Sequence, residues 1–97
     1  MDRKVRSQEQ IEEALSELQG WRYEGDALRK TFVFGSFKEA ISFLVRLAFV
    51  AEEQDHHPEI FNVYNRVELT LRTHDAGNKV TGKDIQLAQS IEQFAWR

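Results

Sequence analysis

The chain has 97 residues, of which 41% are hydrophobic and 30% charged, and it contains no cysteine. This composition predicts one soluble globular domain over residues 1–97, and it excludes disulfides, thiolate catalysis and cysteine-ligated zinc. A formal net charge of -3 disfavours direct nucleic-acid binding, which relies on clustered lysine and arginine. Without cysteine, an apolar leader or a run of about 18 apolar residues, the sequence favours a cytoplasmic protein that does not enter a membrane.

The first predicted element is a helix over residues 7–18. Its apolar residues recur at the spacing of one helical face: Ile11, Ala14, Leu15 and Leu18. Ser7 and Gln10 form the pattern of a capping box, and Gly20 supplies the left-handed conformation that commonly ends a helix.

A β-hairpin is predicted next, with strands over residues 21–24 and 27–34 around Gly25 and Asp26. The second strand alternates, and one of its faces carries Leu28, Lys30, Phe32 and Phe34. Trp21 at the start of the hairpin is interpreted as a core or rim aromatic residue. The alternative is that Trp21 forms a wall of a cleft that binds a flat ring.

The longest predicted element is a helix that begins after Ser36, which forms a second capping-box pattern with Glu39. The helix is expected to end at about His56, because Pro58 disfavours helical geometry at His57. Apolar residues lie on more than one of its sides, so more than one side must be covered. We expect a second subunit to provide the additional cover.

Residues 61–72 alternate as a strand, but this length is unusual, and Asn62 and Asn65 favour a turn. One strand and two short strands split near Asn65 are therefore both open. Thr81 is predicted to cap a third helix, with Asp84 at the acidic position of the box. The apolar side of this helix consists of Ile85, Leu87, Ala88, Ile91, Phe94 and Ala95.

The three histidines lie in two junctions: His56 and His57 at the end of the long helix, and His74 after the strand. Imidazole is the side chain that titrates near neutral pH, so this pooling predicts proton transfer or metal binding. Glu52 lies four residues before His56 on the same helical face, where it is expected to hydrogen-bond the ring. We expect His56 and His74 to be partly exposed, so that alanine at either position lowers catalysis but not stability.

Three interpretations of the histidines are open from the residues alone. In the first, they are structural caps or hydrogen-bond partners. In the second, they bind zinc with an open water position, although His56 and His57 are adjacent and adjacent side chains rarely converge on one ion. In the third, which the arrangement favours, they perform acid–base chemistry, because that chemistry needs donors placed around an organic substrate.

An ordered set of residues then covers nearly the whole chain: Glu52, His56-His57-Pro58, Tyr64, His74 and Asp84, with Gly20-Trp21 before the hairpin, Phe32 and Phe34 within it, and residues 61–65 and 84–88. This set resembles the signature of the pterin-4a-carbinolamine dehydratases, small enzymes that recycle the oxidised pterin made by aromatic amino acid hydroxylases. The main departure is the loop of residues 77–80, which is about one residue longer than in many relatives and contains Lys79.

The resemblance implies an α+β fold in the order α-β-β-α-β-β-α, with an antiparallel four-stranded sheet and three helices packed on one face. It implies a hydro-lyase that converts 4a-hydroxytetrahydrobiopterin to quinonoid dihydropterin plus water in tetrahydrobiopterin recycling, without cofactor or metal. Relatives form dimers through their sheets and some pair further through the long helix, so a homodimer or homotetramer is expected. The alternative function is that of a protein-binding module, because vertebrate relatives also act as dimerisation cofactors of a homeodomain transcription factor.

The family pattern also implies the site. His56, His57 and His74 would surround the hydroxylated carbon as catalytic groups, with His56 and His74 favoured as the proton-transfer pair and His57 as a hydrogen-bond partner of the pterin. The residues expected to line the substrate pocket are Pro58, Thr73, Asp75 and Ala76. The residues expected to support the site are Glu52, Trp21 and Asp84, the last by orienting the His74 loop. Tyr64 is either a site residue or a residue of the sheet.

Overall fold

A computed structural model of the chain describes residues 3–95. Three helices, four strands and one short 3-10 helix follow in the order α1 (Gln8–Leu15), β1 (Arg22–Glu24), β2 (Ala27–Val33), α2 (Phe37–Gln54), β3 (Glu59–Val63), β4 (Arg66–Leu71), η1 (His74–Ala76) and α3 (Gly82–Phe94). The α+β class and the α-β-β-α-β-β-α order predicted from the sequence are therefore confirmed. Within residues 3–95, no helix is long and apolar enough to cross a membrane.

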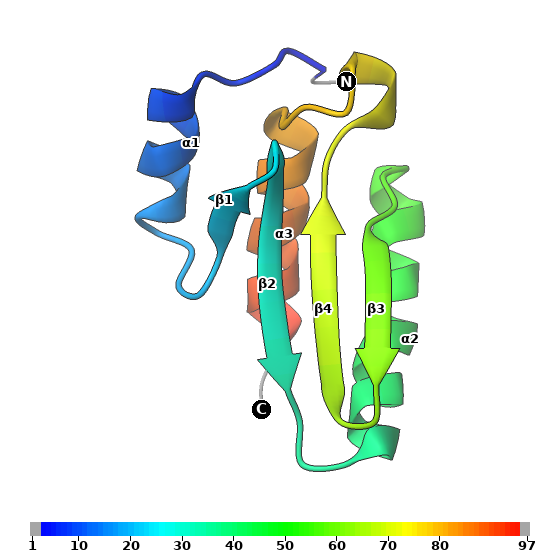
Figure 1. Cartoon of the computed structure of the whole chain (residues 1–97). Helices are drawn as coiled ribbons and strands as arrows, with labels where there is room; N and C mark the ends of the chain where they lie inside the picture. Colours follow the sequence, from blue (N-terminus) through cyan, green and yellow to red (C-terminus); the bar gives the residue numbers. More distant parts are fainter. Residues whose placement is uncertain (1–2, 96–97) are drawn as a thin grey trace.

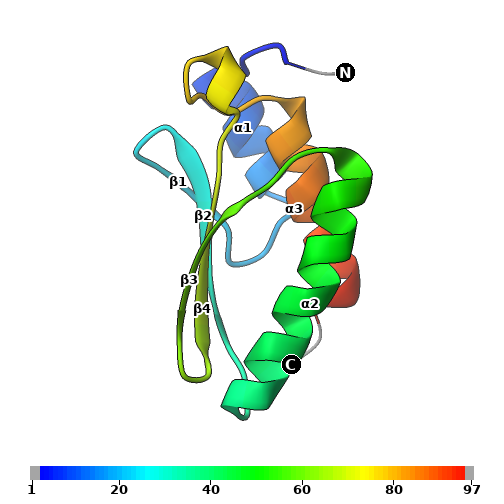
Figure 2. The same cartoon turned by 90° about the vertical axis from the view of Figure 1, so that its right-hand side faces the viewer.

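The four strands form one antiparallel sheet in the order β1-β2-β4-β3. Strands β2 and β4 occupy its centre, with Phe32 directly opposite Val67, while β1 and β3 form the edges. Figure 2 shows that all three helices lie on the same side of this sheet, as predicted. No helix of residues 3–95 lies on the opposite face of the sheet, which agrees with the polar residues that alternate along β2 and β4.

The hydrophobic core lies between the sheet and the helices. Its largest fully buried side chains are Phe32, Ile11, Leu28, Leu47, Leu69, Leu71, Leu87, Ile91, Val67 and Val80. Phe43 of α2 packs on Phe32 with ring centroids 5.0 Å apart, which joins the long helix to the middle of the sheet. The same core holds β4 and α3 in place, and the candidate site lies where the end of β4 and the start of α3 are neighbours.

Two helices end earlier than predicted. Helix α1 stops at Leu15, because the hydroxyl of Ser16 donates to the Glu13 carbonyl and the chain then continues in turns to Gly20, whose φ is 85°. Helix α2 stops at Gln54 and not near His56, because Asp55 adopts the left-handed conformation with φ 52°. The predicted caps Ser7 and Thr81 both form complete capping boxes.

The segment after Pro58 consists of two strands, which decides between the alternatives left open by the sequence. Tyr64 has a φ of 53° at the turn between β3 and β4. The side-chain amide of the next residue, Asn65, donates to the backbone carbonyl of Phe34 over 2.8 Å. Strand β3 begins at Glu59, two residues before the start that was predicted.

Candidate active site

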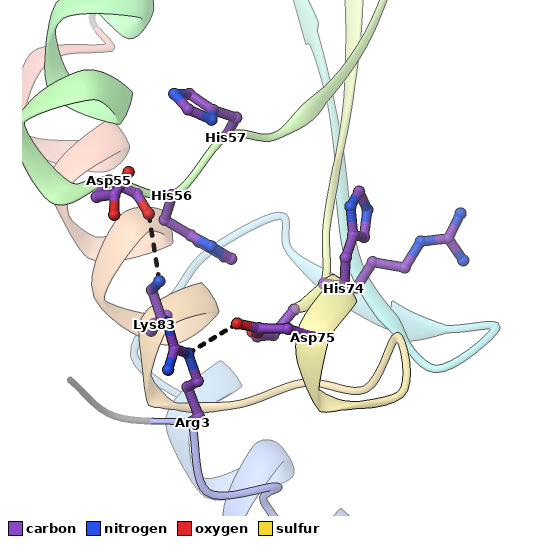
Figure 3. A pocket seen from close by; sticks show the side chains of 9 residues that line it. Arg3, Asp55, His56, His57, His74, Asp75 and Lys83 are labelled. Atoms are coloured by element: carbon purple, nitrogen blue, oxygen red, sulfur yellow. Dashed lines mark hydrogen bonds and ion pairs between the residues drawn. The ribbon is translucent and has the colours of Figure 1, made fainter.

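A pocket of about 530 Å³ lies at the end of the sheet where β4 leads into η1, α2 ends and α3 begins. It is lined by Arg3, Asp55, His56, His57, Arg72, Thr73, His74, Asp75 and Lys83. The three histidines thus lie around one pocket, although two of them come from the end of α2 and the third from η1 (Figure 3). The volume falls within the range of about 300–1,000 Å³ that is typical of small-molecule sites.

His56 is held from behind by a fully buried carboxylate. Its Nε2 lies 2.6 Å from Oδ1 of Asp84, and the His56 side chain is only 8% exposed. The other carboxylate oxygen, Oδ2, accepts hydrogen bonds from the Thr73 hydroxyl over 2.8 Å and from the Thr81 N–H over 2.9 Å. A carboxylate accepts hydrogen bonds and donates none, so the His56 Nε2 carries the hydrogen of this contact.

The partial exposure expected for His56 is therefore wrong, whereas the His74 side chain is 66% exposed as expected. Asp84 fills its predicted capping position, and it also joins the start of α3 to Thr73 and to His56. Thr81 completes the network, because its hydroxyl lies 2.7 Å from that of Thr73. No buried side-chain nitrogen or oxygen in residues 3–95 is without a hydrogen-bond partner.

Glu52 binds a different histidine from the one predicted. Its Oε2 lies 2.5 Å from Nε2 of His57, while His56 turns toward Asp84. The reason is the left-handed residue Asp55, after which the chain no longer follows the helical spacing. The backbone N–H of His56 instead donates to the Ala51 carbonyl, and the side chain of the following residue, His57, contacts Glu52.

His74 is accompanied by a carboxylate that the sequence analysis did not single out. Its Nε2 lies 3.5 Å from Oε2 of Glu59, the first residue of β3. Arg72 binds both oxygens of the same carboxylate, with its Nε 2.6 Å from Oε2 and its Nη2 3.0 Å from Oε1. The hydrogen bonds from Arg72 hold the pKa of the Glu59 carboxyl below its ordinary value of 4.5, although partial burial acts in the opposite direction.

Of the four residues predicted to line the pocket, the structure places Thr73 and Asp75 there. Pro58 and Ala76 adjoin lining residues but are not part of the lining within the described part of the chain. Asp75 also forms an ion pair with Arg3, whose Nε lies 2.9 Å from Oδ2. The N-terminal segment therefore borders the site, which no local pattern in the sequence indicated.

Trp21 and Tyr64 lie away from the pocket. Trp21 is buried in the core, where its Nε1 donates to the Glu92 carboxylate over 2.9 Å, so the core interpretation of this residue holds. Tyr64 is 79% exposed in the turn between β3 and β4, at the opposite end of the sheet from η1 (Figure 1).

The cationic residues Arg72 and Lys83 were also missed. Arg72 ends the predicted strand, and Lys83 directly precedes Asp84, so nearness to the predicted site residues was the one available signal. Lys83 donates to the Asp55 carbonyl over 3.2 Å, which ties the start of α3 to the end of α2 (Figure 3). Within residues 3–95, no three side chains of histidine, aspartate or glutamate converge in the manner of a metal site.

Comparison with known proteins identifies the family. Residues 4–94 match the family model described as pterin 4 alpha carbinolamine dehydratase. The chain belongs to this family. A relative from Opitutus terrae, provisionally named a pterin-4-alpha-carbinolamine dehydratase, is 55% identical over 92 residues that cover 95% of each chain. A relative from Thermomicrobium roseum with the same provisional name is 48% identical over 85 residues, covering 88% of this chain and 90% of the relative.

A solved structure shows the same fold within the carbinolamine dehydratase family. It is a crystal structure from Brucella melitensis described as a transcriptional coactivator/pterin dehydratase, and it is 39% identical to this chain. The TM-score is 0.90, and the match covers 96% of this chain and 100% of the other. The resemblance inferred from the ordered residues of the sequence is thereby confirmed at the level of the family.

Proposed function

We propose that this protein is a 4a-hydroxytetrahydrobiopterin dehydratase of tetrahydrobiopterin recycling, which forms quinonoid dihydropterin plus water by histidine acid–base catalysis. The observation that carries the proposal is the convergence of His56, His57 and His74 on one pocket in a member of this family. Dehydration of a carbinolamine changes no oxidation state, so proton transfers are the chemistry that the protein must supply. Neither a metal nor a cofactor has a step in this mechanism.

His56 is proposed as the general base. Its Nε2–H donates to Asp84, so Nδ1 is the ring nitrogen that holds a lone pair for a substrate proton. When the ring takes up that proton, the buried carboxylate of Asp84 stabilises the positive charge, as the aspartate does in a serine protease triad. Thr73 and Thr81 keep the carboxylate in place.

His74 is proposed as the general acid. The electron pair of the ring nitrogen next to the hydroxylated carbon expels the hydroxyl, and the C–O bond breaks as His74 gives it a proton. The hydroxyl leaves as water, while the ring proton passes to His56, so no proton is gained or lost overall. His57, which Glu52 orients, is proposed to hydrogen-bond the pterin ring.

The decisive experiment is a spectrophotometric assay of dehydration with 4a-hydroxytetrahydrobiopterin generated by an aromatic amino acid hydroxylase. The wild-type protein should accelerate the reaction equally well with and without a chelator such as EDTA. His74→Ala should lower the rate by at least about tenfold, toward the hundredfold that is usual for a lost general acid. A wild-type protein that leaves the uncatalysed rate unchanged would refute the proposal. Activity that is lost in the presence of the chelator would refute the metal-free mechanism.

A second candidate is a protein-binding module that keeps the fold. The observation that favours it is a stripe of exposed apolar residues on α2, which consists of Phe37, Ile41, Val45 and Phe49. None of these four residues lines the pocket. If protein binding were the whole function, substitution of the histidines would leave it intact, whereas substitution within the α2 stripe would abolish it.

A further inference from the structure

The three imidazoles of the pocket share one arrangement. Each has a carboxylate at its Nε2: Asp84 at His56, Glu52 at His57 and Glu59 at His74. None of the three carboxylates lines the pocket. The pocket therefore exposes the three imidazoles to a ligand, while their three carboxylate partners lie outside the lining, as is common for carboxylates that set the tautomer and orientation of a functional histidine.

We propose that Glu59 is a positioning residue for His74. The inference rests on the dehydration proposed above, and it assigns to the first residue of β3 the same task that Asp84 performs for His56. Glu59 accepts the hydrogen of His74 Nε2 and thereby directs Nδ1 toward the substrate. The separation of 3.5 Å is at the long end for a hydrogen bond, and catalytic hydrogen bonds of this kind commonly shorten when the substrate binds.

The carboxylate is well placed for this role because the sheet holds it. Glu59 lies opposite Thr70 in the β3–β4 ladder, and Arg72, the residue that directly follows β4, reaches it diagonally. The two hydrogen bonds from Arg72 leave Glu59 few alternative rotamers, and Oε2 faces both Arg72 Nε and His74 Nε2. His74 belongs to a short turn, so a contact with a rigid strand restricts where its ring can point.

The charge on Glu59 supports the assignment. A glutamate carboxyl is ionised at neutral pH, and the hydrogen bonds from Arg72 lower the pKa of Glu59 further, so Glu59 is an acceptor without a hydrogen of its own. Elsewhere on the sheet, Arg22 and Glu68 form a similar ion pair between strands over 3.1 Å, but no histidine adjoins it. That pair provides a matched control.

The test is a double-mutant cycle on dehydration. Glu59→Gln should lower kcat by about tenfold, a coupling usual for contacting residues, with little change in KM. The control Glu68→Gln should retain the wild-type kcat. In a His74→Ala background, Glu59→Gln should have no further effect, because the group that it positions is gone. Folding should survive, since ion pairs this exposed contribute little to stability.

Two readings would overturn the inference while leaving the proposed dehydratase intact. One is an active wild type whose kcat is unchanged by Glu59→Gln. The other is a loss of kcat on Glu59→Gln that is equally large in the wild-type and His74→Ala backgrounds. A wild type without dehydratase activity would instead count against the proposed function. As a measurement independent of turnover, ¹⁵N NMR of the neutral His74 ring should show the hydrogen on Nε2 in the wild type and a mixture of tautomers in Glu59→Gln; an unchanged tautomer would refute the positioning role.

Discussion

His56 and His74 are the same side chain in opposite surroundings. His56 is buried against a carboxylate that has no access to solvent, whereas His74 stands in the open on a 3-10 turn. A buried carboxylate is costly unless it keeps its hydrogen-bond partners, and a surface imidazole has few contacts to lose. The two histidines therefore differ in what their removal does to the fold, even if both transfer protons.

At this scale, His56→Ala is expected to destabilise the protein by about 1–3 kcal/mol, because the buried carboxylate of Asp84 loses a hydrogen-bond partner. His74→Ala should change the free energy of unfolding by about 0.5 kcal/mol or less. Both should lower turnover per folded molecule by at least about tenfold. Urea denaturation and the dehydration assay, run on each variant, measure the two quantities separately.

The control for this prediction is His56→Gln, whose side-chain amide nitrogen can take the place of the imidazole Nε2 and still donate to Asp84. It should recover part of the stability lost in His56→Ala, but none of the turnover, because an amide takes up no proton at neutral pH. Equal stability loss at both histidines would contradict the contrast, and normal turnover per folded molecule in either alanine variant would contradict its catalytic role.

At the scale of elements, local patterns in the sequence predicted most of the fold. Apolar periodicity and the caps at Ser7 and Thr81 located the helices, and the alternation along β2 and β4 located the centre of the sheet. What they did not predict were the partners of the histidines. These depend on the left-handed residue Asp55, which ends α2 about two residues earlier than predicted, and on a contact between His74 and Glu59 of the edge strand β3.

The N-terminal wall of the pocket was unpredictable for the same reason. Arg3 reaches Asp75 because the N-terminal segment pairs with the loop before α3, where the Arg6 N–H donates to the Val80 carbonyl over 2.9 Å. Nothing in the residues around Arg3 specifies a partner that far along the chain. The His56-His57 and Thr73-His74 pairs, in contrast, were accessible from the sequence, because both follow the end of a regular element, and all four residues line the pocket.

The β3–β4 pair makes a prediction about acid stability. Arg72 lowers the pKa of Glu59 in the folded state, so below the ordinary value of 4.5 the unfolded chain binds this proton more readily than the folded chain does. The stabilisation is therefore present above that value and is lost as the pH falls through the lowered pKa. Arg72→Gln should remove it, so that the variant loses less stability than the wild type between neutral pH and about pH 3.

Urea denaturation of both proteins across that pH range tests the prediction, with Arg22→Gln as the control because Arg22 pairs with Glu68, whose ion pair lies away from the pocket. The difference between wild type and Arg72→Gln should be small, since the Arg72 and Glu59 side chains are 30% and 43% exposed and solvent screens the pair. Parallel stability curves for the two proteins would show that Arg72 does not set the acid response of Glu59.

At the scale of the whole molecule, the one-sided arrangement of helices leaves apolar surface uncovered. The α2 stripe is exposed by 54% at Phe37, 37% at Ile41, 53% at Val45 and 74% at Phe49. These four residues recur every fourth position and so form a continuous band along the outside of the longest helix. Bands of this kind on otherwise charged surfaces mark sites of protein association.

We predict that a second copy of the chain covers the α2 stripe, so that the protein is a homodimer or homotetramer at micromolar concentration. Two such stripes are self-complementary across a twofold axis, and their burial removes aromatic surface from water on both copies. Val45→Glu should lower the mass measured by light scattering, because it places a charge in the middle of the contact. Glu13→Lys, a charge change at an exposed residue of α1, should leave the mass unchanged. A monomeric wild type would refute the assembly, and an oligomer that tolerates Val45→Glu would move the contact away from the stripe, to the exposed apolar residues of edge strand β3 such as Phe61.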